Sequence, residues 1–261
     1  MQRVQLILRG HWGHFYSYLY KFCESGESEH LHQARIGWRR LKSALHFFEP
    51  LYRNVSPFHA RALRPLLDQI GKVRDMDVAL EETLPAWRVL YAGDRPRLRL
   101  QWDSMLKALR EQREQGRLAI SQAFHQVQIH DGLKRAIQWI DELHTHSDTA
   151  LCEMTGEAFS IWTDHRLRRL YRKMVLCCDN QELKRQHQAR LLAKQLRYLL
   201  ESFQNELRGR WPRETLKRTK ALQAEIGLRL DRRRAYELVQ SLRHYPELAD
   251  FIHKRQKCPE K

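Results

Sequence analysis

Cationic side chains recur once per helical turn in two segments of this 261-residue sequence. If residues 32–48 are helical, four such side chains share one face, within roughly an 80° arc of the helical wheel: His32, Arg35, Arg39 and Lys42. Arg40 adds a further charge at the edge of this face. Arginine and lysine side chains at one-turn intervals can bind successive phosphates of a polyanion. The spacing therefore predicts an anion-binding helix face, which we call the first cationic ladder.

A later segment repeats this pattern. The tetrapeptide His-Gln-Ala-Arg occurs at 32–35 and again at 187–190, where it begins a second cationic ladder: His187, Arg190, Lys194 and Arg197. Apolar residues fall on the opposite side of each helix: Ala34, Trp38, Leu41, Leu45 and Phe48 in the first, and Ala189, Ala193, Leu196, Leu200 and Phe203 in the second. Each helix is therefore predicted to have one face in the core and one cationic face.

A solvated helix face is the simplest alternative for the ladders. Solvated faces normally mix charges of opposite sign, which stabilise one another at i,i+4 spacing. The ladders contain no carboxylate, and like charges at this spacing repel by roughly 0.3 kcal/mol per pair. A bound polyanion would offset that repulsion, so we favour an anion site over a solvated face.

An internal repeat extends beyond the ladders. LDQIGKVRDMDVALE at 67–81 aligns with LQAEIGLRLDRRRAYE at 222–237, at nearly the same offset as the two ladders. Two ordered blocks at one offset indicate two homologous helical halves, about 1–140 and 150–250. Two basic pairs at matching positions of the repeat either widen the cationic surface or are ordinary surface charge: Arg61 with Arg64, and Lys217 with Lys220.

Helices must position the ladders, and apolar spacing predicts helices along most of the chain. Gly (11) and Pro (8) are scarce and no hairpin signal is present, so we predict an all-α fold. We expect Asp75 and Asp231 to begin helices as caps, and a helix to stop before Pro85. The predicted helices cover about 1–24, 28–48, from 56 or 57 through 70, 75–84, 98–127, 131–145, 155–176, 180–207, 213–226 and 231–243, with a loop at 92–97.

The charge balance indicates the kind of partner. Forty-seven Lys and Arg against 31 Asp and Glu give a formal charge of +16, which suggests nucleic acid, an anionic membrane or polymeric phosphate. No apolar run approaches the roughly 20 residues that span a bilayer, and the N-terminus lacks the pattern of a secretory signal. The five cysteines form no disulfide pattern, so we expect a reduced, cytoplasmic protein that does not act at a membrane.

Three motifs resemble one known family. The segment 32–42 is similar to the first motif of the conserved histidine α-helical domain (CHAD) family, and HQARLLAKQLRYLLE at 187–201 is similar to its second. IGKVRDMDV at 70–78 resembles the family's Leu-Gly-x-x-Arg-Asp-x-Asp-Val element. The resemblance covers roughly 1–90 and 160–245 in the right order, whereas 91–160 carries no motif.

The resemblance implies two four-helix bundles related by a pseudo-twofold axis, within a single domain over 1–261. It also implies a basic groove or channel between the bundles that binds inorganic polyphosphate, and association with polyphosphate granules. The implied binding residues are His32, Arg35, Arg39, Arg40, Lys42, Arg74, His187, Arg190, Lys194 and Arg197. Lys42 stands where the family often has Arg, which keeps the charge and loses the bidentate geometry.

The family domain is often fused to a triphosphate tunnel metalloenzyme domain, which opens with Glu-x-Glu-x-Lys. Here Glu27 and Glu29 are followed by Leu31 instead of Lys. We therefore expect a stand-alone binding module and not an enzyme, with no cofactor. Catalysis by His32 and His187 would need nearby carboxylates for a metal or a general acid, and the ladders offer none.

Two alternatives stay open. The first is a helical protein that binds nucleic acid without sequence preference, because its charge fits and Trp12, Trp38, Trp102 and Trp211 could stack on bases. No nucleic-acid-binding motif is visible, and a polyphosphate binder would itself bind nucleic-acid backbones weakly. The second is a phosphate-metabolism enzyme or metal-binding protein that uses the motif histidines. The pairs His11 with His14, His30 with His32, His144 with His146, and Cys177 with Cys178 match no metal motif, so we predict no metal site.

Overall fold

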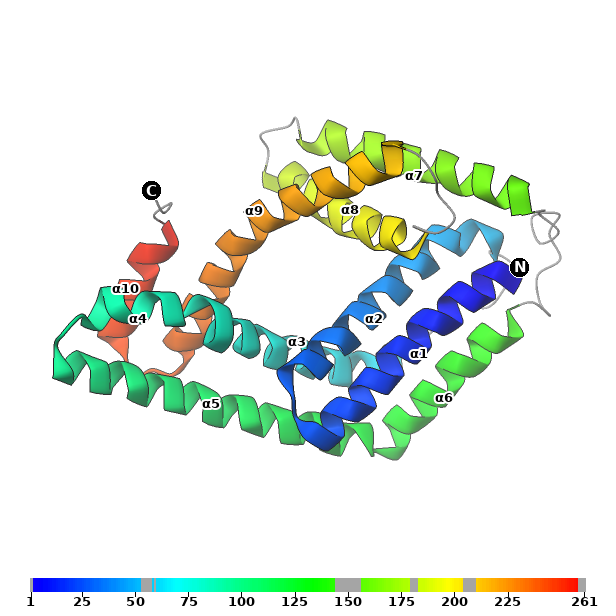
Figure 1. Cartoon of the computed structure of the whole chain (residues 1–261). Helices are drawn as coiled ribbons and strands as arrows, with labels where there is room; N and C mark the ends of the chain where they lie inside the picture. The colour runs from blue at the N-terminus through cyan, green and yellow to red at the C-terminus, as the bar shows by residue number, and fades with distance from the viewer. Residues whose placement is uncertain are drawn as a thin grey trace. The chain divides into compact units, whose positions relative to one another are not determined.

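The computed structural model describes residues 2–52, 58, 60–143, 156–178, 183–203 and 210–257. Their regular structure is entirely helical, which confirms the predicted all-α class (Figure 1). The α-helices are α1 (Gln2–Ser25), α2 (Ser28–Phe48), α3 (Arg64–Val78), α4 (Pro85–Ala92), α5 (Pro96–Phe124), α6 (Val127–Glu142), α7 (Gly156–Cys178), α8 (Leu183–Ser202), α9 (Arg210–Ser241) and α10 (Pro246–Lys257). None of these helices is long and apolar enough to cross a membrane, as judged over the described residues.

The boundaries of the helices that carry the ladders agree with the prediction. α2 begins at Ser28 and ends at Phe48, as the sequence predicts. α8 lies inside the predicted range 180–207. The expected helix start at 56 or 57, the ends of several predicted helices, and the histidines at 144 and 146 lie outside the described residues.

Two predicted breaks are wrong. α3 runs without interruption through Gly71 and Asp75, and α9 runs through Gly227 and Asp231, so neither aspartate begins a helix. A helical glycine costs only about 1 kcal/mol relative to alanine, and packing can offset that cost. The side chain of Asp75 accepts a hydrogen bond from Arg234 Nη1 at 3.0 Å, so it pairs α3 with α9 instead of capping a helix.

The helical run that contains α3 stops before Pro85, as predicted, and Pro85 itself begins the next helix. A π-helical turn, Ala79–Thr83, follows α3 directly, and the Leu84 N–H donates to the Ala79 carbonyl at 2.9 Å. Proline suits the first position of a helix, because its missing N–H would have no partner there. α4 therefore begins at Pro85. Pro246 begins α10 in the same way, a helix that is not among the predicted ones.

The chain divides into two compact units that are each discontinuous in sequence. The first unit comprises Met1–Tyr18, Gln33–Ala60 and Gly132–Ile226. The second comprises Leu19–His32, Arg61–Asp131 and Gly227–Lys261. Each unit takes segments from both predicted halves, so the units do not follow the repeat, and the pseudo-twofold repeat and the single domain over 1–261 stay predictions.

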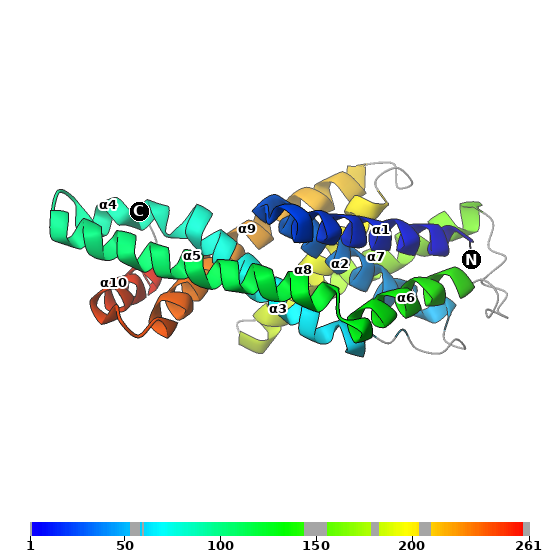
Figure 2. The ribbon, with the colours of Figure 1, turned by 90° about the horizontal axis from the view of Figure 1, so that it is seen from below.

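The first unit packs α2, α6, α7 and α8 with the beginnings of α1 and α9. Figures 1 and 2 show α1 running beside α2 and α6, and the Gln5 side chain of α1 donates to the Asp141 carbonyl of α6 at 2.7 Å. Phe48 of α2 stacks on Trp162 of α7, with ring centroids 6.2 Å apart. α1 and α2 approach closely at Gly37, where an added Cβ would lie 2.6 Å from the Phe15 nitrogen.

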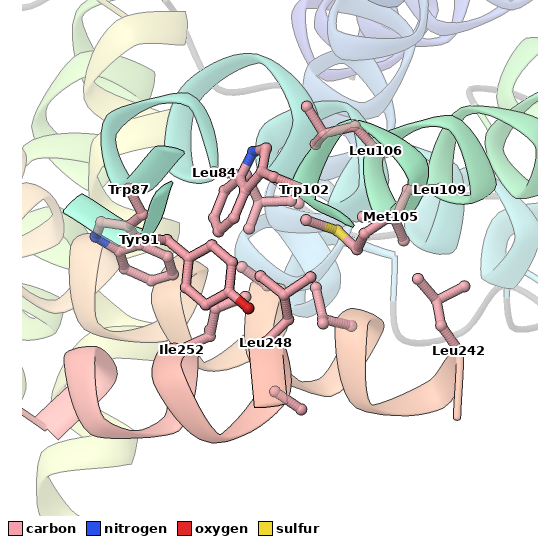
Figure 3. Close-up of a cluster of buried hydrophobic side chains, with 14 of the residues drawn as sticks. Leu84, Trp87, Tyr91, Trp102, Met105, Leu106, Leu109, Leu242, Leu248 and Ile252 are labelled. Carbon is pink, nitrogen blue, oxygen red and sulfur yellow. The ribbon is translucent and has the colours of Figure 1, made fainter. Parts of the chain in front are cut away.

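The second unit has its own apolar core. Figure 3 shows this cluster between α4, α5, the end of α9 and α10, with Trp102 fully buried among side chains that include Trp87, Tyr91 and Ile252. A buried ion pair also ties this unit together. Arg113 of α5 donates to Asp77 of α3 at 2.9 Å and to the Gly26 carbonyl at 2.8 Å.

Candidate anion-binding site

Both ladder helices are amphipathic as predicted. In the second ladder segment, the five apolar residues predicted for the core are all buried, four of them in α8 and the last directly after its end: Ala189, Ala193, Leu196, Leu200 and Phe203. On α2, Ala34, Leu41 and Phe48 are buried, while Trp38 and Leu45 are half-buried. The burial of these apolar sides directs the ladders away from the core of the first unit.

The ladder cations are held at the surface of the first unit. Lys42 is exposed. The other lysine and the arginines of the two ladders are half-buried, together with Arg40 at the edge of the first: Arg35, Arg39, Arg40, Arg190, Lys194 and Arg197. His32 is half-buried and belongs to the part of α2 assigned to the second unit. His187 lies in α8, and its side chain is outside the described part of the structure.

Two side-chain contacts join the ladders of α2 and α8. Arg39 Nη1 donates to the Tyr198 hydroxyl at 3.5 Å, and Arg40 Nη2 donates to Glu201 Oε2 at 3.2 Å. The Arg197 guanidinium lies over the Tyr198 ring, 4.8 Å from its centroid, in a cation–π contact. Residues about 160 positions apart in sequence are therefore in direct contact.

Glu201 corrects the view that the ladders have no compensating carboxylate. Besides the bond from Arg40, its Oε1 lies 3.8 Å from Arg197 Nε and 3.8 Å from Lys220 Nζ. Arg197 and Glu201 form an i,i+4 pair that is readable in the sequence, whereas the contacts of Glu201 with Arg40 and Lys220 depend on the fold. Part of the repulsion at this end of the ladders is thus offset within the protein.

The additional basic candidates fall in both units. Lys220 of α9 reaches Glu201, and Lys217 lies one turn earlier and is exposed. Arg61 and Arg64 belong to the second unit, where Arg64 lies 3.9 Å from Asp68. Arg74 is buried in the second unit and donates to Glu82 at 3.2 Å. The structure therefore brings Lys220 to Glu201 beside the ladders, and it places Arg61, Arg64 and Arg74 in the second unit.

Two histidines of α1 lie near Arg40, a feature that sequence reasoning missed. Burial lowers the pKa of His11 to about 4, and the positive charge of Arg40 contributes to the shift. His11 Nε2 is 3.0 Å from the Ser202 hydroxyl, and His14 Nε2 is 3.2 Å from Gln33 Oε1. Burial also lowers the pKa of His14. Both imidazoles are therefore neutral at pH 7 and act as hydrogen-bonding groups of the first unit.

Metal ligands do not gather in the described part of the chain. No group of three His, Cys, Asp or Glu side chains there is arranged to hold a metal ion. The chemistry that the described side chains offer near the ladders is hydrogen bonding by guanidinium, ammonium and hydroxyl groups. Guanidinium groups suit phosphate in particular, because their N–H groups form a fork that matches two of its oxygens.

Comparison with known proteins identifies the family. The CHAD domain family matches residues 6–240, so the chain belongs to this family, as the motif resemblance predicted. The structure is also similar to the crystal structure of the CHAD domain from the plant Ricinus communis, with a TM-score of 0.78 and 23% sequence identity. The similarity covers 98% of this chain and 84% of the plant chain, and at this identity it establishes the fold alone. No protein of curated function matches the chain.

Proposed function

We propose that this protein binds inorganic polyphosphate along the cationic faces of α2 and α8. The observation that carries the proposal is that the arginines and lysines of both ladders lie in the first unit, opposite largely buried apolar faces, and that α2 and α8 are joined through Arg39–Tyr198 and Arg40–Glu201. The CHAD family is linked to polyphosphate binding in general, which supports this choice of polyanion.

The mechanism of binding is electrostatic. Each arginine or lysine of the ladders donates charge-assisted hydrogen bonds to phosphate oxygens, and these bonds are stronger than those between neutral groups. Half-buried guanidinium groups are screened less than fully exposed ones, so they retain more of that attraction at physiological salt. Binding releases counterions from the polymer, and the affinity therefore falls steeply as the salt concentration rises.

The proposal is of a binding module and not of an enzyme. Its described cations act as ligands for the phosphate chain, and no step of bond making or breaking is assigned to them. The proposal extends to association with polyphosphate granules in the cell, because a granule presents the same polymer at high density. A fluorescent fusion that stays dispersed in cells rich in granules would contradict this extension.

The test removes four ladder charges together, by Arg35→Gln, Arg39→Gln, Arg190→Gln and Lys194→Gln. Four charge-assisted hydrogen bonds at about 1.5 kcal/mol each are lost, so we expect long-chain polyphosphate binding to be abolished while circular dichroism shows intact helices. A matched control removes four exposed charges of the same unit, by Arg169→Gln, Arg172→Gln, Lys173→Gln and Arg213→Gln. Undiminished binding by the ladder variant would reject the site, as would equal losses in both variants.

A further inference from the structure

Glu201 is surrounded by positive charge from three helices of the first unit. Arg40 comes from α2, Arg197 from α8 and Lys220 from α9, and each lies within 4 Å of one of its carboxylate oxygens. The Glu201 side chain is 19% exposed, so the carboxylate is enclosed without being sealed from solvent. These three cations form an anion site, and the Glu201 carboxylate fills it.

One carboxylate does not satisfy the donors around it. The Arg40 contact at 3.2 Å is a hydrogen bond, while the Arg197 and Lys220 contacts at 3.8 Å are too long to be hydrogen bonds. Among the described residues, the buried Nε atoms of Arg40 and Arg197 have no hydrogen-bond partner. A buried donor without a partner costs free energy. A phosphate group offers more acceptor oxygens than a carboxylate and is not tied to α8.

We propose that Glu201 occupies a phosphate subsite formed by Arg40, Arg197 and Lys220, and that an incoming phosphate displaces it. The identity of the natural occupant as polyphosphate rests on the function proposed above, whereas the subsite can be tested without the polymer. Glu201 acts as an internal competitor that lowers the affinity for every anion. Glu201 therefore makes the subsite selective, because only an anion that offsets the cost of displacing this carboxylate binds there.

The competition excludes single anions more effectively than it excludes a polymer. A free orthophosphate makes no other contact that could offset the displacement of Glu201. A polymer already held by Arg35, Arg39 or Lys194 presents its next phosphate at a high effective concentration, so it tolerates the same cost. The subsite would thus bind the small phosphates of the cell weakly and a long polyphosphate chain strongly.

A purely structural role for Glu201 makes the opposite prediction. If Glu201 only clamps α2, α8 and α9 together, its neutralisation destabilises the unit and weakens the binding of any anion. If Glu201 competes with ligands, its neutralisation leaves three cations without their counterion and strengthens anion binding. Phosphate should then stabilise the variant, because an anion that binds only the folded state raises the unfolding temperature.

The experiment compares Glu201→Gln with Glu237→Gln. Like Glu201, Glu237 forms an ion pair with the arginine four residues before it, and it accepts a hydrogen bond from that residue, Arg233 of α9, at 2.9 Å. The control therefore makes the same chemical change in the same i,i+4 pattern. Thermal unfolding is followed while inorganic orthophosphate is titrated into each variant and the wild type. We expect Glu201→Gln to bind orthophosphate about tenfold more tightly than the wild type, which corresponds to about 1.4 kcal/mol, and Glu237→Gln to match the wild type.

Three results would overturn the inference. They are an equal gain in both variants, no gain in Glu201→Gln, and weaker polyphosphate binding by Glu201→Gln than by the wild type. If Glu201→Gln does not fold, Glu201→Asp replaces it, because its shorter side chain cannot reach all three cations and should give a smaller gain of the same sign. Failure of the proposed function is distinguishable, since the wild type would then not bind polyphosphate whatever the orthophosphate titration shows.

Discussion

Arg40 of α2 lies beside two ionisable groups, the Glu201 carboxylate and the His11 imidazole. It donates to the first at 3.2 Å and helps to lower the pKa of the second to about 4. Burial is the main reason that His11 stays neutral, and the charge of the same guanidinium that attracts Glu201 adds to this effect. The protonation of His11 should therefore make the folding stability of the first unit depend on pH.

Folding stability should fall as the pH drops from about 6.5 to about 4. In this window the unfolded chain binds a proton at His11 and the folded chain does not, so acidification favours unfolding. The full loss attributable to His11 is roughly 3 kcal/mol, from the size of the pKa shift. His11→Gln should remove much of this loss, because glutamine does not titrate and can still hydrogen-bond to Ser202.

Chemical denaturation at pH 7 and at pH 4.5 measures this difference. Carboxylates also titrate in this range, so the informative quantity is the pH-dependent loss of the wild type minus that of the variant. Exposed His165 of α7 provides the control, and His165→Gln should leave the loss unchanged. Equal losses in the wild type and His11→Gln would contradict the assigned burial of this imidazole.

The cationic residues of the site could be predicted from the sequence, whereas the residues that contact them from other helices could not. The ladders were visible because one helix determines the face on which residues at i, i+3 and i+7 lie. His11 and Tyr198 were not predicted, because their proximity to Arg40 and Arg39 depends on the packing of separate helices. Glu201 lay one turn beyond the last ladder residue, and its partners on α2 and α9 could not be read from α8 alone.

The helix that holds the first ladder, α2, crosses α1 closely at a glycine. At Gly37 of α2 an added Cβ would lie 2.6 Å from the Phe15 nitrogen and 2.8 Å from its Cα, and these are backbone atoms of α1. Backbone cannot move aside as cheaply as the end of a side chain, so Gly37→Ala should force α1 and α2 apart. We expect a loss of about 2–3 kcal/mol in the free energy of unfolding.

A second glycine of the same unit is the matched control for this crossing. Gly13 of α1 has no atom within 4 Å of the position of an added Cβ, and it lies inside a helix. Gly13→Ala should therefore stabilise the protein by about 0.5–1 kcal/mol, through the higher helix propensity of alanine. Urea denaturation of both variants tests the pair, and equal effects would show that the crossing is not tight.

Helix boundaries were predictable where local signals were unambiguous. α2 begins and ends as predicted because Ser28 and Pro50 bracket one continuous apolar pattern. The breaks expected at Asp75 and Asp231 were wrong. A glycine with an aspartate four residues later resembles a helix junction, but α3 and α9 run through both positions, because one helical glycine costs only about 1 kcal/mol. α10 had readable signals, namely Pro246 at its start and Leu248, Ala249 and Ile252 at helical spacing.

The molecule as a whole carries a formal charge of +16, and both its units are rich in basic residues. Net charge alone would attract any polyanion and would not distinguish polyphosphate from nucleic acid. The half-buried ladders place their cations at fixed positions, which net charge alone does not do, and Glu201 holds three cations around one carboxylate. Selectivity between polyanions is therefore the property that separates a shaped site from a generic basic surface.

The most direct test compares long-chain polyphosphate with single-stranded and duplex DNA, at equal phosphate concentration and about 150 mM salt. The account predicts that polyphosphate binds about a hundredfold more tightly than either DNA, a difference of about 2.7 kcal/mol. Equal affinities for the three polymers would contradict it, and would mean that the ladders of α2 and α8 are a basic surface without preference for polyphosphate.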